Sequence, residues 1–256
     1  MDPGIRSPLV DFFRRGDVAR DVRLQAAQGA LAPRAIDQLA LLLVLLDDGD
    51  PEVARSASAT IDRLPQVPLS GFLANPDVSA EMRAFFAARG IQPSGEAPQT
   101  DEPLIDDGQE EVAEGPPNED DLSTSRRLAQ MNVMQRIKVA MRGRREERSI
   151  LIRDPNRLVS VAVLSSPKVT DAEVESFAKM ANVSEEVLRV IGMNRQWTKN
   201  YGVVAGLVRN PKTPVAISLT LLQRINDKDV RVLATDRNIP EPIRIAARKR
   251  ATASRT

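Results

Sequence analysis

Five cationic side chains fall within eleven residues of this sequence. They are Lys138, Arg142, Arg144, Arg145 and Arg148. Lys138 and Arg142 are four residues apart, a spacing that puts both on one face of a helix. A cationic cluster of this density binds phosphates or acidic peptide segments in a salt-dependent way. The alternative interpretation is a solvated helix face that Glu146 and Glu147 partly neutralise.

A second candidate site holds the only Trp and the only Tyr of the chain, four residues apart and alternating with two cations. Its residues are Arg195, Trp197, Lys199 and Tyr201. Aromatic rings beside cations can stack on nucleic-acid bases or anchor a bound peptide. The alternative is that the two rings pack against a neighbouring helix.

The residues that most often do chemistry are missing from the chain, because it contains no histidine and no cysteine. Serine–histidine and cysteine–histidine triads, disulfides and cysteine-based zinc sites are therefore excluded. Catalysis by carboxylates or a lysine remains possible, but the sequence shows no set of residues that could be assigned to it. We expect a protein that is not an enzyme, and we assign no catalytic residue, cofactor or metal ligand.

The formal net charge of +1 hides three segments of different charge. Residues 1–90 carry −2, residues 91–124 carry −11 without one basic residue, and residues 125–256 carry +14. Proline and glycine also concentrate in the acidic stretch, which is poor in large apolar residues and cannot bury enough surface to offset its ordering entropy. We therefore expect a disordered linker at 92–122 between an N-terminal module, 1–91, and a basic C-terminal module, 123–256.

Two roles fit the expected linker. It could be a solubilising spacer, or an acidic tether that folds back on the basic module and competes with acidic partners. At the short range of such a tether, even weak electrostatic contact is populated at low salt.

One short motif occurs five times, and apolar residues at helical spacing follow each copy. An Asn or Ser starts the motif and a Ser, Thr or Pro ends it, at 75–79, 166–170, 182–184, 210–214 and 238–240. The residue before proline is pushed out of the α region, so the preceding helix ends there. The Ser, Thr or Pro that follows suits the cap or first turn of the next helix. Each copy therefore predicts a corner between two stacked helices.

These corners predict an all-α chain of short helices. In the N-terminal module we expect helix starts at 21–27 and 50–57, an apolar helix at 35–46 between them, and helical patterns at 56–64 and 80–88. In the C-terminal module we expect nine helices between 124 and 251, the first at 124–141. Residues 157–164 are rich in β-branched side chains and could form a strand. They lead into a corner as residues 201–208 do, 44 residues later and within the helix expected at 197–208, so we expect a helix there too.

Two related families resemble this chain at the quoted residues. The helix start at 50–53, with its following alanines, resembles HEAT and HEAT-like repeats. The corner at 210–214, followed by Leu219 and Leu222, resembles the leucine-rich repeat variant family. The resemblance covers most of 15–91 and 150–252, and implies a right-handed α-solenoid that serves as a binding platform. The iron–sulfur cluster of some leucine-rich repeat variant proteins needs cysteines and is not expected here.

These observations predict a non-enzymatic protein-interaction scaffold, whose unidentified protein partner is acidic if the basic clusters bind it. The alternative is nucleic-acid binding through the phosphate backbone by the basic C-terminal module. The first residues lack the apolar core of a signal peptide, and no apolar run is long enough to span a bilayer. We expect a soluble, cytoplasmic protein without membrane contact.

Overall fold

The computed structural model describes residues 4–5, 7–95, 98, 100–105 and 121–253. This part of the chain is all-α, with sixteen α-helices, one 3₁₀ helix and no β-strand. Their bounds are α1 Pro8–Arg14, α2 Arg20–Ala27, α3 Ala35–Leu45, α4 Pro51–Asp62, α5 Gln66–Leu73, α6 Ala80–Ala87, α7 Asp121–Gln130, α8 Val133–Arg142, α9 Arg145–Leu151, α10 Arg157–Val163, α11 Asp171–Lys179, α12 Glu185–Met193, η1 Trp197–Lys199, α13 Tyr201–Arg209, α14 Val215–Leu222, α15 Asp227–Leu233 and α16 Glu241–Ala253. No helix among the described residues has the length and hydropathy needed to cross a membrane.

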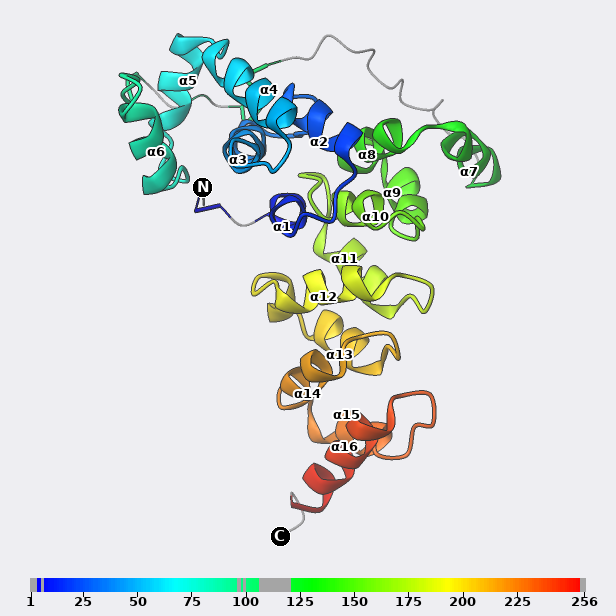
Figure 1. Ribbon diagram of the computed structural model, residues 1–256. Helices are drawn as coiled ribbons and strands as arrows, with labels where there is room; N and C mark the ends of the chain where they lie inside the picture. The colour runs from blue at the N-terminus through cyan, green and yellow to red at the C-terminus, as the bar shows by residue number, and fades with distance from the viewer. Residues whose placement is uncertain (1–3, 6, 96–97, 99, 106–120, 254–256) are drawn as a thin grey trace.

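From α7 onward the helices alternate between two layers, as in a helical repeat protein. Each even-numbered helix packs against the next, from α8 through α10, α12 and α14 to α16. In the other layer α7 packs against α9, and α11 packs against α13. Figure 1 shows the result as a column that leads away from the N-terminal helices and ends at α16.

The first helix connects the N-terminal helices to this column. α1 packs against α3 on one side and against α10 on the other (Figure 1). At this contact the backbone N–H of Leu9 donates to the Ser165 hydroxyl at 3.2 Å. Arg15, which follows α1, pairs with Glu186 of α12 at 2.7 Å. The two halves of the chain therefore touch through residues from its beginning.

The five predicted corners all end directly before a helix. Ser79, Thr170 and Ser184 are the N-caps of α6, α11 and α12, and each side chain accepts a hydrogen bond from the backbone N–H three residues on. At the other two corners Pro214 and Pro240 precede α14 and α16. A local motif predicts these positions correctly because it acts on the backbone of its own residues.

Two of the expected helices are each divided in two. The helix expected at 124–141 is interrupted, and Asn132 starts α8 with a capping box in which it and Gln135 satisfy each other's backbone N–H. The helix expected at 197–208 is divided by Asn200, whose side chain accepts from Gly202 N and starts α13. An Asn cap inside an amphipathic pattern ends one helix and begins another without breaking the apolar stripe.

Two helices, α1 and α5, were not expected, and α5 holds Pro68 in its first turn, where proline is tolerated. The helix expected at 157–164 is confirmed as α10. Its residues from Leu158 to Val163 are all buried, which explains a composition that also suits a strand. A helix enclosed on every side has no polar face to reveal its period.

The expected linker lies partly outside the described residues, at 96–97, 99 and 106–120. Residues 101–105 lie within them and hydrogen-bond to the first turn of α3 and to Gln38. The disordered linker at 92–122 stays a prediction, and residues 101–105 of it are hydrogen-bonded to α3. Whether the acidic stretch folds back on the basic module concerns residues outside the described part.

We predict that filling the space at Gly206 will separate α11 from α13. A Cβ there would meet Lys179 Cγ at 3.1 Å and Ala178 Cβ at 3.2 Å. Gly206→Val should lower the free energy of unfolding by about 1–3 kcal/mol, because core overpacking forces neighbours apart. In urea titrations the control Gly49→Ala, which meets nothing within 4 Å, should change it by less than about 0.5 kcal/mol. Equal stability of the two variants would contradict this close packing.

Candidate functional site

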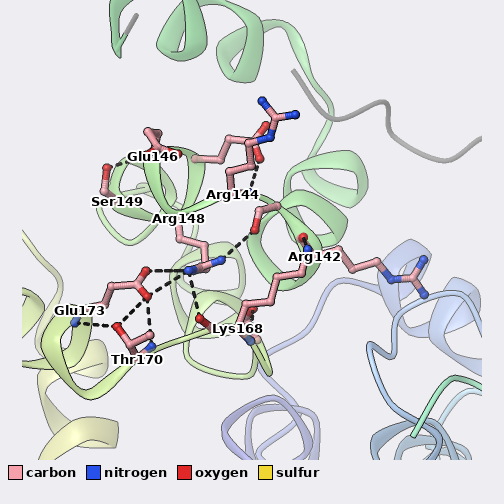
Figure 2. Close-up of polar contacts among 11 residues, drawn as sticks. Arg142, Arg144, Glu146, Arg148, Ser149, Lys168, Thr170 and Glu173 are labelled. Carbon is pink, nitrogen blue, oxygen red and sulfur yellow. Dashed lines mark hydrogen bonds and ion pairs between the residues drawn. The ribbon is translucent and has the colours of Figure 1, made fainter. Parts of the chain in front are cut away.

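Arg148 lies at the centre of the first cationic cluster, but it is buried (Figure 2). Its guanidinium donates to both carboxylate oxygens of Glu173, each at 3.0 Å. It also donates to the carbonyls of Gly143 and Lys168, at 2.8 and 3.1 Å. With its donors directed to these internal acceptors, Arg148 offers no free charge to an external ligand.

The carboxylate of Glu173 has a second role, because it closes the start of α11. Glu173 is the third residue of this helix and forms a capping box with Thr170, whose backbone N–H donates to the carboxylate at 3.0 Å. The N-terminus of a helix favours negative charge. A single carboxylate thus caps α11 and holds a cation of α9.

The same arrangement occurs once more in this layer of the column, and the ion pair alone occurs at a further corner. Glu147, the third residue of α9, accepts from Arg127 of α7 at 2.6 Å and from the backbone N–H of Arg144 at 2.6 Å. Asp229, the third residue of α15, accepts from Arg209 of α13 at 2.5 Å, while the cap of this helix is the side chain of Asn226, which accepts from Asp229 N. At three corners, therefore, an ion pair joins the third residue of a helix to an arginine of the preceding helix in the same layer.

The other four cations of the first cluster keep some exposure, but they do not act as one group. Arg142 and Arg145 are exposed, whereas Lys138 and Arg144 are half-buried. Arg142 extends away from Arg148 in Figure 2, and its guanidinium lies 3.5 Å from the Ala32 carbonyl. The Lys168 ammonium donates to the Arg142 carbonyl at 2.7 Å. The structure brings Arg142, Arg144 and Arg145 to the α8–α9 corner and leaves Arg148 beneath it.

The two aromatic residues of the second candidate site have different surroundings. Trp197 is half-buried and packs against the hydrophobic core, so its ring is not free to stack on a base. Tyr201 is exposed, and its hydroxyl hydrogen-bonds to Asp229 and accepts from the backbone N–H of Asn226. Arg195 and Lys199 are exposed beside them, and Lys199 donates to Gln196 at 2.7 Å.

A pocket of about 400 Å³ lies next to Tyr201, between the ends of α11 and α13 and the start of α15. Small residues of α13, Gly202, Ala205 and Gly206, line it together with charged ones, Lys179, Arg209 and Asp229. The charged groups are engaged with acids or bases of the protein, since Lys179 pairs with Glu175 at 2.6 Å and Arg209 with Asp229.

Two pKa values at this pocket are shifted in opposite directions. Desolvation, and then the hydrogen bond to Asp229, hold the pKa of Tyr201 above its ordinary value. The hydrogen bond from Tyr201, helped by the charge of Arg209, holds the pKa of Asp229 below its ordinary value. The phenol therefore stays protonated and the carboxylate ionised near neutral pH.

Sequence reasoning missed a set of exposed apolar side chains on three consecutive helices of the even-numbered layer. Met193 at the end of α12 is 71% exposed, Val215 and Leu219 of α14 are 38% and 36% exposed, and Ile245 of α16 is 47% exposed. α14 contains no charged residue and buries Ser218, Leu221 and Leu222 on its other face. The signal was present in the sequence, because residues 215–222 are apolar on both faces of the helix.

The described residues contain no group of three or more His, Cys, Asp or Glu side chains that could hold a metal ion. Comparisons with protein-family models, with curated proteins and with solved structures found no match for this chain. The surfaces that remain to explain are the apolar side chains of α12, α14 and α16, the pocket beside Tyr201 and the cations of the α8–α9 corner.

We predict that Arg148 and Glu173 depend strongly on each other. Arg148→Ala should lower the free energy of unfolding by about 3–5 kcal/mol, because it leaves a buried carboxylate without its cation. The double variant Arg148→Met/Glu173→Leu should recover part of this loss in urea titrations, because it removes the unpaired charge but also the acceptor of the Thr170 N–H. As a control, Arg189→Ala breaks an exposed pair with Glu185 and should cost less than about 1 kcal/mol. A cost for Arg148→Ala no larger than for this control would contradict the assigned role.

Proposed function

We propose that this chain is a non-enzymatic protein-interaction scaffold, a right-handed solenoid of HEAT-like or leucine-rich-repeat-variant-like repeats in the cytoplasm. The observation that carries the proposal is the uncharged, solvent-exposed face of α14, where Val215 and Leu219 lie one helical turn apart. The helices that pack against α14 on either side, α12 and α16, also expose a large apolar side chain each. Exposed aliphatic side chains on neighbouring elements are typical of surfaces that bind proteins.

The charge of the helices that carry these exposed apolar side chains indicates what kind of partner would bind them. Exposed cations stand next to α14 in the sequence, Lys212 before it and Arg224 after it, and α16 exposes Arg248 and Lys249. Residues 125–256 carry a net charge of +14. A partner with an apolar contact face edged by carboxylates would match both features, the apolar centre giving affinity and the charged rim giving orientation and association rate.

A second candidate function is binding to nucleic acid through the phosphate backbone. The observation that favours it is the group Arg142, Arg144 and Arg145, which keeps exposure at the α8–α9 corner. Pairing of Arg127 and Arg148 with carboxylates of the protein limits the size of this group. The scaffold is therefore the better supported of the two functions.

The scaffold proposal predicts that charge on α14 will abolish partner binding. In Val215→Glu/Leu219→Glu the carboxylates would sit at the centre of the apolar contact and lose hydration on binding, without a large effect on folding. The control is Val67→Glu on α5, a side chain that is 85% exposed and lies outside α12, α14 and α16. Affinity isolation from the native cells, followed by mass spectrometry, should recover the partner with the wild type and the control only.

Recovery of the same proteins by all three forms, each shown by circular dichroism to be folded, would refute a binding role for α14. Recovery of nothing by the wild type under cross-linking conditions would also count against the scaffold.

The nucleic-acid candidate predicts a measurable salt dependence. Replacing Arg142, Arg144 and Arg145 together by Ala should reduce the slope of log affinity against log salt by about 2–3 for duplex DNA, since each lost phosphate contact contributes about 0.9. Arg189→Ala on α12 is the matched control and should leave the slope unchanged. An identical slope in the triple variant would eliminate this corner as a nucleic-acid interface.

A further inference from the structure

A buried glutamine of α3 holds the backbone of a segment far along the chain. Gln38 is 1% exposed. Its side-chain oxygen accepts from the backbone N–H groups of Leu104 and Ile105, at 2.8 and 3.1 Å, and its nitrogen donates to the Ile105 carbonyl at 2.9 Å. Both ends of one amide side chain thus bind the main chain of residues 104–105.

The other end of the same segment completes the N-terminus of α3. The N-cap residue of this helix, Arg34, makes no side-chain capping hydrogen bond. Instead Asp101 accepts from the first two helical N–H groups, from Ala35 through its carbonyl at 3.1 Å and from Ile36 through its carboxylate at 3.4 Å. Unsatisfied N–H groups at a helix start need such acceptors, and here a distant segment supplies them.

Between these two anchors the segment packs its apolar side chains on the protein. Leu104 and Ile105 are half-buried against the hydrophobic core. Gly29 lies beneath Ile105 with φ +93°, where a Cβ would come within 3.8 Å of Ile105 and 3.4 Å of the Gln38 nitrogen. The Gly29 carbonyl accepts the second hydrogen bond from that nitrogen at 3.0 Å. A left-handed glycine next to a buried amide therefore forms a close-fitting groove.

The contacts of residues 101–105 are those of a bound linear peptide. The segment has no helix or strand of its own, and Pro103 favours the extended backbone that the groove needs. Recognition rests on one acidic residue, two adjacent aliphatic side chains three and four positions later, and two stretches of main chain. We propose that this groove, formed by Gly29 and residues 34–38, is a peptide-binding site that residues 101–105 occupy as an intramolecular latch.

The partner of the groove is then a protein segment with the same pattern, an aspartate followed after two residues by two aliphatic residues. A latch on a short tether has an effective concentration in the millimolar range, so it holds the groove against weak ligands and yields to a stronger or multivalent one. This site is separate from the α14 surface, and its test does not depend on the scaffold partner.

The test uses a fluorescent peptide that copies residues 99–106 and the full-length protein in two forms. Leu104→Ser/Ile105→Ser weakens the latch and leaves the groove intact. Fluorescence anisotropy should show that this form binds the peptide at least about tenfold more tightly than the wild type, because its competitor is gone. The same peptide with serines in place of its Leu and Ile should not bind either form.

The role of Gln38 is tested by adding Gln38→Ala to the latch variant, which should abolish peptide binding while circular dichroism shows a folded protein. If that variant does not fold, hydrogen exchange on the wild type replaces it, and excess peptide should speed exchange at the amides of Leu104 and Ile105. Equal peptide affinity of wild type and latch variant, absence of binding to both, or exchange that the peptide does not change would overturn the proposal.

Discussion

The repeat column depends on one electrostatic constraint, the need to satisfy a helix N-terminus where a corner is packed against the next repeat. Free N–H groups at such a corner need an acceptor, and a carboxylate at the third helical position provides it. Once drawn out of water, that carboxylate needs a cation, and the preceding helix of the same layer supplies one at the starts of α9 and α11. At the start of α15 the more exposed Asp229 also pairs with a cation of the preceding helix, Arg209, but there the side chain of Asn226 is the cap. At α9 and α11 the same carboxylate therefore caps its own helix and forms the ion pair that holds this helix against the preceding one.

The sequence predicts the corners well because their chemistry is local. The Ser, Thr and Pro residues that start α6, α11, α12, α14 and α16 act on their own backbone, so the five motifs give helix starts directly. The role of Arg148 is not local. Its partner Glu173 lies 25 residues away, and the sequence alone shows only another arginine in a cationic run.

The contacts of residues 101–105 could not be predicted from the sequence of that segment. Its composition, with two acids and a proline, predicts a linker, and nothing within the segment indicates a binding partner. Order there depends on an amide on α3 and on a glycine with positive φ, neither of which has a sequence pattern of its own. The apolar character of α14 on both faces is visible in the sequence, but its exposure is not, because the equally apolar α10 of the same layer is covered by α1.

The position of α1 between α3 and α10 has a consequence for synthesis on the ribosome. The Leu9–Ser165 hydrogen bond joins residues 156 positions apart. At about 5–20 residues per second, α1 emerges roughly 8–30 s before α10 is made. During that interval the side of α1 that packs against α10 in the native protein has no native cover. A chaperone that covers this surface would therefore bind the nascent chain after α1 is made and before α10 is made.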